Sequence, residues 1–565
     1  MPTTNKTFKV FSEKLGGTHA DAYIGREGEI FYDPDSTTLR VSDGATVGGI
    51  IIASGGGDAV PSVFGPTISL GTGAAQGGQG TKSVAIGFNA GQNQGDHSVA
   101  VGDAAGQTDQ DDSAVAIGEK AGSEGQHWGS IAIGPKAGKR GRIGGNGDET
   151  IAIGFKAGEN EQRYHAIAMG SEAGQDDQQW DAIAIGRAAG NYGQNYQAVA
   201  VGHRAGNDSQ DYRAVAVGAY AGNYNQDSGA VAVGAYAGET DQQDETVAIG
   251  YNAGNYNQRY HSIAIGAEAG ESNQYWDAIA IGRSAGNYDQ DHQAIAIGHR
   301  AGQDYQQQQS VAIGTYAGQN SQSEHAIAIG AYAGQDNQEP TAIAIGEEAG
   351  NYEQGHHAVA IGRSAGTTSQ GWNAVAVGRF AGLTQQGEGA IGIGHYAGRN
   401  LQQEETVAIG YGAGDDGQKY HAIAIGADSG AISQGWDAVA IGRSAGNENQ
   451  GSQAVAIGHR AGLYDQDNRS VAIGWKAGEY SQGQHCIAIG AYAGQTDQLD
   501  ETIVLNATNS PSNPANPSSF NVTPVRTVAN GDPDFGDFTY GLVYNPSTGE
   551  IAKMSFADIN TKLGA

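Results

Sequence analysis

Cysteine, proline and positive charge are scarce in this sequence. One cysteine in 565 residues excludes an internal disulfide framework and a cysteine-based zinc site. Lys and Arg number 30 against 61 Asp and Glu, a net charge of −31, so the basic footprint that nucleic-acid binding requires is missing. No window approaches the roughly 18 consecutive apolar residues of a transmembrane helix, and no secretory signal is evident after Met1. We therefore expect no nucleic-acid partner and no membrane insertion.

Glycine, by contrast, is abundant, with 92 residues, and it is periodic. The glycine that ends each Val/Ile-Ala-Val/Ile-Gly tetrad recurs every 16 residues from Gly154 to Gly490, and five earlier copies begin at Gly71. The step after Gly87 is one residue shorter than the regular 16, and the step after Gly134 is four residues longer. A fixed period of this length predicts a solenoid.

The columns of the repeat predict an all-β fold, a parallel β-solenoid or β-roll. With the tetrad glycine as position 0, Val or Ile occupies −3 and −1, Ala occupies −2 and +3, Gly occupies +4 and Gln occupies +8. A strand over these tetrads alternates faces. We expect the aliphatic face to fill a narrow coil and the Ala/Ala/Gly face to form a subunit seam, although a second sheet of the same coil could also cover the small residues.

Two further columns have a structural interpretation. The glycine at +4 is expected at a corner where φ is positive. The glutamine at +8 suits a ladder of side-chain amides that hydrogen-bond from one turn to the next. At about 4.8 Å per turn, some 28 turns predict a rod about 130 Å long.

The two ends depart from the repeat and divide the chain into four segments. Residues 1–56 carry two short strands around Pro34 and form an N-terminal attachment domain, with a Gly/Ala-rich connector at 57–66. Residues 67–506 form the shaft. A proline-rich segment that cannot join the ladder follows, and 507–565 form a C-terminal β cap or tip with a second strand–turn–strand pattern.

A longer period shows that blocks of turns have been duplicated. Tyr164-His165, Trp180-Asp181 and His203-Arg204 recur 96 residues later and again a further 160 residues on. These steps correspond to six and ten turns. The later copies are Tyr260-His261, Trp276-Asp277, His299-Arg300, Tyr420-His421, Trp436-Asp437 and His459-Arg460. We interpret this lengthening as selection for reach or valency.

The tetrads from Ser83 and Ala182 resemble the head repeats of trimeric autotransporter adhesins, which form left-handed parallel β-rolls that assemble as trimers. The 16-residue period, the Ala-Gly at +3/+4 and the Gln column depart from that family. A closer resemblance is to bacteriophage virion fibres, particularly those of cyanophages. The segment 25–44 is similar to the N-terminal domain of the phage major tropism determinant, and 502–526 resembles the segment that closes such arrays. The resemblance implies a homotrimeric fibre with attachment, shaft and end.

Outward aromatic residues are the candidate surface-binding site. They occupy position −6: Trp128, Tyr164, Trp180, Tyr260, Trp276, Trp372, Tyr420 and Trp436. Stacked aromatic rings beside polar groups can bind polysaccharide multivalently, and the alternative is that they pad corners of the coil or a trimer groove. Cys486 stands in the small-residue column −4, so we expect a buried core residue. The 15 histidines are scattered, and we expect no metal site and no cofactor.

A non-enzymatic virion fibre is the function that these patterns favour. A catalytic site needs one singular place, and this chain offers many near-copies of one turn. We expect a homotrimer that is assembled in a host cytoplasm, joins other virion proteins through its N-terminal domain and binds a host-surface glycan or protein receptor. The alternatives are a cellular trimeric surface adhesin and, less favoured, a polysaccharide depolymerase or an ice-binding solenoid.

Overall fold

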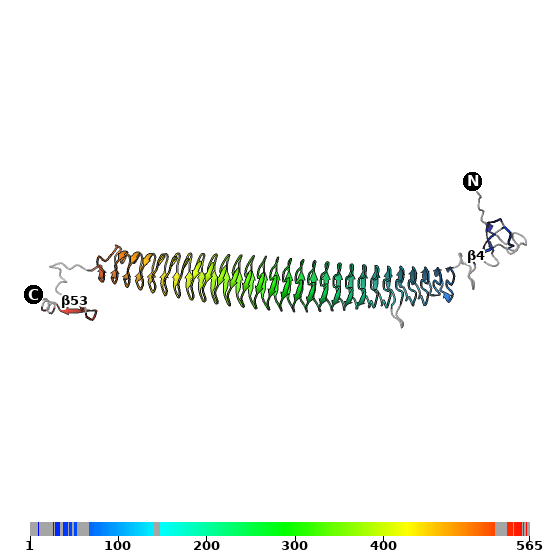
Figure 1. The fold of residues 1–565 in the computed structure, drawn as a ribbon, viewed down its shortest axis with the longest axis horizontal. Helices are drawn as coiled ribbons and strands as arrows, with labels where there is room; N and C mark the ends of the chain where they lie inside the picture. Colours follow the sequence, from blue (N-terminus) through cyan, green and yellow to red (C-terminus); the bar gives the residue numbers. More distant parts are fainter. Residues whose placement is uncertain are drawn as a thin grey trace, which may run out of the picture. The chain divides into compact units, whose positions relative to one another are not determined.

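The computed structural model describes residues 67–140 and 147–525, together with short stretches between 9 and 53 and between 540 and 561. The fold is all-β, and its main part is a parallel β-solenoid of 16-residue turns, which confirms the predicted fold class (Figure 1). The chain divides into two compact units, Met1–Glu388 and Gly389–Ala565. Each unit is described by itself.

The first unit contains a ladder of twenty parallel strands of three residues each, which we call the aliphatic sheet. Each strand spans positions −3 to −1, and equivalent residues pair from turn to turn, as Val215 with Val231 and Ala216 with Ala232. The strands are β5 (Ile68–Leu70), β7 (Val84–Ile86), β9 (Val99–Val101), β10 (Val115–Ile117), β11 (Ile131–Ile133), β12 (Ile151–Ile153), β13 (Ile167–Met169), β14 (Ile183–Ile185), β16 (Val199–Val201), β18 (Val215–Val217), β20 (Val231–Val233), β22 (Val247–Ile249), β24 (Ile263–Ile265), β26 (Ile279–Ile281), β28 (Ile295–Ile297), β30 (Val311–Ile313), β32 (Ile327–Ile329), β34 (Ile343–Ile345), β36 (Val359–Ile361) and β38 (Val375–Val377).

A second sheet, the polar sheet, lies opposite and uses positions +6 to +8 of each turn. In turns where the pairing is shorter, single β-bridges such as Thr108 with Glu124 continue it. Its strands in the first unit are β6 (Gly78–Gln79), β8 (Asn93–Gln94), β15 (Tyr192–Gln194), β17 (Asp208–Gln210), β19 (Tyr224–Gln226), β21 (Thr240–Gln242), β23 (Tyr256–Gln258), β25 (Ser272–Gln274), β27 (Tyr288–Gln290), β29 (Asp304–Gln306), β31 (Asn320–Gln322), β33 (Asp336–Gln338), β35 (Tyr352–Gln354), β37 (Thr368–Gln370) and β39 (Thr384–Gln386).

The interior of the coil is built from small residues, and this corrects the predicted placement of the two faces. The alanines at −4, −2 and +3 are fully buried, as Ala198, Ala200 and Ala205 show, whereas the Val and Ile at −3 and −1 point outward and are only partly covered. The aliphatic residues therefore do not fill the coil, and the small-residue face is no subunit seam. The alternative that a second sheet of the same coil covers the small face is confirmed.

Close contact between the two sheets explains why branched side chains are absent from positions −2 and +3 of the regular turns. A Cβ added to Gly206, at position +4, would lie 2.5 Å from Oε1 of Gln210 in the polar sheet and 3.2 Å from the methyl group of Ala200 in the aliphatic sheet. The predicted positive φ at this corner is confirmed, with a value of 49° at Gly206. Because the interior is already filled, Val or Ile at −2 or +3 would separate the sheets.

The predicted glutamine ladder is confirmed. Nε2 of Gln194 donates to Oε1 of Gln210 at 3.1 Å, to the carbonyl oxygen of Ile183 at 2.8 Å and to that of Ala198 at 3.1 Å. The same pattern repeats through the column, and the glutamines are almost completely buried. Each amide thus stabilises a neighbouring turn and satisfies carbonyl groups that the thin interior would otherwise leave unpaired.

Four short strands near the N-terminus form a separate sheet: β1 (Lys9–Val10), β2 (Ile30–Asp33), β3 (Thr38–Val41) and β4 (Ile50–Ala53). The predicted pair of strands around Pro34 is confirmed, because β2 and β3 pair antiparallel from Ile30–Val41 to Asp33–Thr38. The connector predicted at 57–66 lies outside the described residues.

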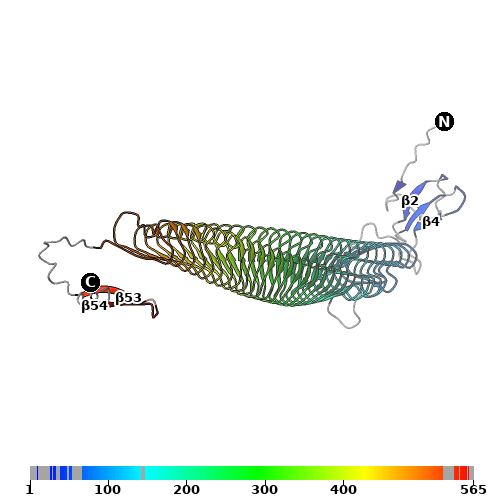
Figure 2. The same ribbon diagram turned by 60° about the vertical axis from the view of Figure 1, so that its left-hand side comes forward.

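The second unit repeats the two-sheet coil, as the stacked turns in Figure 2 show. Its aliphatic sheet contains β40 (Ile391–Ile393), β42 (Val407–Ile409), β43 (Ile423–Ile425), β44 (Val439–Ile441), β45 (Val455–Ile457), β47 (Val471–Ile473), β49 (Ile487–Ile489), β51 (Ile503–Asn506) and β52 (Phe520–Thr523). Its polar sheet contains β41 (Asn400–Gln402), β46 (Tyr464–Gln466), β48 (Tyr480–Gln482) and β50 (Thr496–Gln498). Cys486 is fully buried at position −4, as predicted.

The ladder extends beyond the predicted end of the shaft at residue 506. After the proline-rich segment, β52 pairs parallel with β51, from Ile503–Phe520 to Asn506–Thr523. The prolines lie outside the two paired strands, so they lengthen the connection without removing a ladder hydrogen bond. Farther on, β53 (Tyr540–Asn545) and β54 (Glu550–Ser555) form an antiparallel hairpin, which confirms the predicted C-terminal strand–turn–strand pattern.

Candidate functional site

The aromatic residues at position −6 lie on the outside of the coil, in the short turn that leads from the polar sheet to the aliphatic sheet. Their rings are therefore not buried within one chain. Tyr164 is half-buried and the others are exposed, by 39–56%: Trp128, Trp180, Tyr260, Trp276, Trp372, Tyr420 and Trp436. Because solvent reaches these rings, they are available to a ligand or to another chain.

Six of the eight predicted residues form three pairs with the same edge-to-face contact. The ring centroids of Tyr164 and Trp180 lie 5.6 Å apart with an interplanar angle of 82°. The corresponding contacts are Tyr260–Trp276, at 6.2 Å and 77°, and Tyr420–Trp436, at 6.4 Å and 83°. The contact fixes the rings in place. Trp128 and Trp372 belong to none of these three pairs, although Trp372 packs against His356 at 5.7 Å.

A column of charged side chains accompanies these pairs at position −5. The histidine after each tyrosine lies between two carboxylates from the turns on either side. Nε2 of His165 is 3.4 Å from Glu149, and Nδ1 is 3.0 Å from Asp181. The arrangement repeats at His261 with Glu245 and Asp277, and at His421 with Glu405 and Asp437. Sequence reasoning noted the duplicated dipeptides but missed this alternation of charge along the coil.

Arginine and histidine occupy the other side of the aliphatic strand, at +1 and +2. Nη2 of Arg187 donates to Nε2 of His203 at 2.6 Å, and the pairs Arg283–His299 and Arg443–His459 repeat the contact at 2.7 and 3.0 Å. Partial burial, together with the charges of Arg187 and Arg204, holds the pKa of His203 below its usual range. The neutral imidazole accepts the hydrogen bond from the guanidinium.

Tyrosines at +2 continue this surface in two of the three duplicated blocks. His203 packs edge-on against Tyr220, which stacks on Tyr236 at 5.1 Å with an interplanar angle of 4°. The second copy, Tyr316 and Tyr332, is nearly identical, at 5.1 Å and 9°. The third block differs, because Lys476 takes the place of the first tyrosine, and Arg460 forms a salt bridge of 3.1 Å with the buried Glu479. The two sides of the aliphatic strand, position −5 on one and positions +1 and +2 on the other, therefore carry different side chains.

The outward Val and Ile between these two margins form an exposed apolar stripe. All the outward residues of the regular turns are partly accessible, and several isoleucines at −1 reach 36–41% exposure, among them Ile185, Ile249 and Ile441. Isolated apolar residues on a surface need no explanation, whereas a continuous stripe is a candidate interaction surface. The sequence prediction placed this stripe inside the coil and so missed it.

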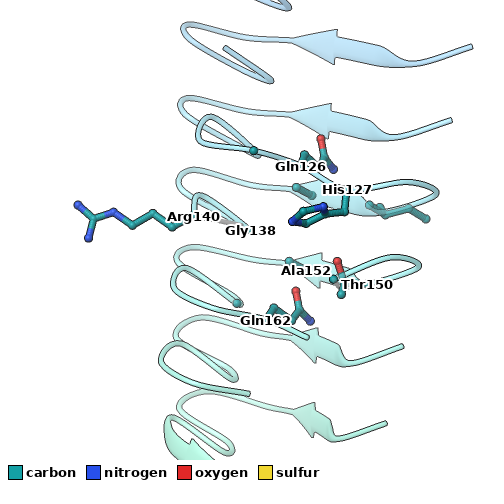
Figure 3. Close-up of a pocket in the computed structure, with 12 residues that line it drawn as sticks. Gln126, His127, Gly138, Arg140, Thr150, Ala152 and Gln162 are labelled. Atoms are coloured by element: carbon teal, nitrogen blue, oxygen red, sulfur yellow. The ribbon is translucent and has the colours of Figure 1, made fainter. Parts of the chain in front are cut away.

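The one long step in the repeat produces a small internal pocket of about 20 Å³. Figure 3 shows Gln126 and Gln162 on turns on either side of it, with His127 nearby and Arg140 extending away from the coil. Among the described residues no donor reaches Oε1 of Gln162, because the intervening turn brings no glutamine to the ladder. The pocket has room for one water molecule and is a defect of the ladder rather than a ligand site.

No described group of three or more His, Cys, Asp or Glu side chains is arranged to hold a metal ion. Within the described residues, no helix has the length and apolar character needed to cross a membrane. No protein-family model, curated protein or solved structure matches this chain. The geometry of the outer columns is therefore the basis for a functional proposal.

Proposed function

We propose that this chain is a non-enzymatic structural fibre of a virion, and that it assembles as a homotrimer through its aliphatic sheets. The observation that carries the proposal is the outward stripe of Val and Ile in each unit. A stripe of this extent on a single chain is unfavourable in water, and burial against further copies removes it from solvent.

The fibre would act mechanically. Repeated turns joined by backbone ladders and buried glutamines make a stiff support whose length is set by the number of turns. The N-terminal strands would join other virion proteins. The exposed aromatic residues at −6 would contact a host-surface glycan or protein receptor, and repetition of weak sites along three chains would raise the avidity. The near-identical turns support a binding role rather than catalysis, because catalysis needs one singular constellation.

The oligomeric state is the first test. Size exclusion with light scattering on the full chain is expected to give three times 57.9 kDa, about 174 kDa. A mass of 57.9 kDa across micromolar concentrations would overturn the fibre proposal, because the stripe would then be exposed in the working protein.

The location is the second test. Gold-labelled antibody against residues 67–140 is expected to decorate fibres that project from the virus particles that encode this chain. Label confined to cell surfaces would overturn the virion assignment and favour a cellular adhesin.

A further inference from the structure

In the three duplicated blocks, the aliphatic sheet has two margins whose charges follow a common pattern. Position −5 comes two residues before the outward residue at −3, and positions +1 and +2 follow the outward residue at −1. We call these the −5 margin and the +1/+2 margin. Any copy that covers the stripe brings its own margins next to these two.

In the first duplicated block, the two margins carry opposite charges on the first and third of three successive turns, and on the second turn when His165 is protonated. The −5 margin holds Glu149, His165 and Asp181, in which the histidine binds both carboxylates and carries positive charge when protonated. On the same three turns, the +1/+2 margin holds Lys156, Glu172 and Arg187. When His165 is protonated, the order is negative, positive, negative on one margin and positive, negative, positive on the other.

The two later blocks keep this relation on the third turn, which pairs Asp with Arg, and on the second turn when the histidine is protonated. Glu245, His261 and Asp277 share their turns with Asn252, Glu268 and Arg283. Glu405, His421 and Asp437 share theirs with Gly412, Asp428 and Arg443. In both blocks the first turn is neutral on the +1/+2 margin, and no turn of the nine has like charges on its two margins.

Contacts within one chain leave part of this charge unmatched. Arg187, Arg283 and Arg443 each bond a histidine, and none has a carboxylate partner among the described residues. This is unexpected in a chain with a net charge of −31, where carboxylates outnumber basic groups two to one. An acidic group from outside the chain would complete each site.

We infer that copies of this chain associate parallel and without stagger, so that the −5 margin of one copy lies against the +1/+2 margin of the same turn in the next. The inference rests on the homo-oligomer proposed above and adds its polarity and register. Asp181, Asp277 and Asp437 then face Arg187, Arg283 and Arg443 of the neighbouring copy.

A shift by one turn in either direction places acid against acid. In one direction Asp181 meets Glu172, Asp277 meets Glu268 and Asp437 meets Asp428. In the other direction Glu149, Glu245 and Glu405 meet Glu172, Glu268 and Asp428. Since the aliphatic stripe is nearly the same on every turn, it cannot fix the register, and the margins supply the specificity that it lacks.

An antiparallel arrangement is disfavoured for a similar reason. A two-fold axis perpendicular to the coil brings each margin against its own kind, so that the arginines of the +1/+2 margin never meet the aspartates of the −5 margin. Parallel copies around an axis along the coil always bring the −5 margin to the +1/+2 margin. The parallel arrangement follows for two copies as well as for three.

The area of the stripe is sufficient for a stable interface. Twenty turns in the first unit, at about 4.8 Å per turn and about 10 Å across three residues, give a face of about 960 Å². A standard protein interface buries about 800 Å² on each partner. The first unit alone therefore reaches this size.

Engineered disulfides test the register directly. In a full-length Cys486→Ser background, the pair Asp181→Cys and Arg187→Cys is expected to give covalent oligomers on mild oxidation. The pairs Asp181→Cys with Glu172→Cys and Asp181→Cys with His203→Cys, displaced by one turn, are expected to give at least tenfold less. Oligomers that link through a displaced pair instead would overturn the zero-stagger register while leaving the fibre proposal intact. A monomer in every variant would overturn both.

Charge reversal tests the cause. The variant Arg187→Glu, Arg283→Glu, Arg443→Glu and the variant Asp181→Arg, Asp277→Arg, Asp437→Arg are each expected to raise the concentration of half-dissociation at least tenfold, and their combination is expected to restore it. A matched control for the aspartate variant, Asp208→Arg, Asp304→Arg, Asp336→Arg, makes the same change in net charge on the polar sheet and should leave the mass unchanged. Unaltered association in all variants would overturn the inference. It would also be overturned if the arginine variant lost binding to dextran sulfate without a change in mass, because the arginines would then bind an anionic ligand rather than a second copy.

Discussion

The aliphatic and polar sheets of the coil share one interior but differ completely outside. Inward, both present small or amide side chains: Ala at −2 from one sheet and Gln at +8 from the other. Outward, the aliphatic sheet presents Val and Ile, whereas the polar sheet presents Tyr, Asp, Asn and Ser at +6 and +7. The same thin interior therefore supports one face that water solvates well and one that it does not.

This difference separates folding from association. The interior is nearly invariant from turn to turn because each alanine, glycine and glutamine contacts its equivalents in the adjacent turns. Burial of the aliphatic residues is incomplete in one chain, so part of their hydrophobic free energy is left for contact with other copies in the proposed oligomer. Substitutions inside the coil should alter the stability of the chain, and substitutions on the aliphatic face should alter the assembly.

The largest effect is expected at the tetrad glycine. In Gly218→Ala the new Cβ would lie 2.4 Å from the carbonyl oxygen of Gly234, at a φ of 136° that side chains avoid. We expect a loss of about 3–5 kcal/mol in the free energy of unfolding, measured by urea denaturation. Gly193→Ala is the control, since its Cβ meets nothing closer than 4.0 Å, at a φ of 62°. The control should lose about 1 kcal/mol. Equal losses would show that the close approach of the backbones is unimportant.

A somewhat smaller effect is expected from a break in the glutamine ladder. Gln226→Ala removes donor contacts to Val215, Ala230 and Gln242 and leaves a cavity. We expect a loss of about 2–4 kcal/mol, with faster amide exchange in β18 and β20. The exposed Gln309→Ala should change the free energy of unfolding by less than about 0.5 kcal/mol. If both variants unfold at the same urea concentration, the buried amides do not stabilise the coil.

On the aliphatic face, substitutions should change the mass of the particle more than the stability of the chain. Ile185→Thr, Ile249→Thr and Ile361→Thr keep β-branching, and each should cost at most about 1 kcal/mol of folding free energy. We expect light scattering to show the loss of the oligomer while circular dichroism stays unchanged. The matched control replaces Tyr224, Tyr256 and Tyr352 on the polar face with Thr and should leave the mass unchanged. Dissociation of the control instead would place the interface on the wrong sheet.

Period, strand position, corner glycines and the glutamine ladder were all predictable because each follows from spacing and residue type along the chain. The inside and outside of the aliphatic strand were not, because alternation gives two faces without saying which is inward. The usual rule that branched residues are buried failed at Val215 and Val217. The interior holds the Gly222 corner and the Gln226 amide, and these leave room only for alanine.

The outer columns were predictable to different degrees. Position −6 followed from the sequence, because the aromatic column is visible by eye and its rings are exposed. The ion pairs of His165 and the bond from Arg187 to His203 depend on contacts between turns 16 residues apart, which appear only when charges are read along a column. The sequence contains that signal, and it is found once the repeat is aligned by position.

The smallest effect is expected on the polar face, from backbone strain. Tyr305 at +7 adopts a φ of 59° and is 62% exposed, so its left-handed conformation is not offset by burial. Asn tolerates this conformation better, and Tyr305→Asn should raise the free energy of unfolding by about 0.5–1 kcal/mol in urea. Tyr288→Asn at +6, where φ is not positive, should give no gain. An equal gain at both positions would attribute the effect to the loss of an exposed ring. A gain confined to Tyr305 would show that the left-handed backbone at +7, which the tight coil imposes, restricts which residues the polar face accepts at low cost.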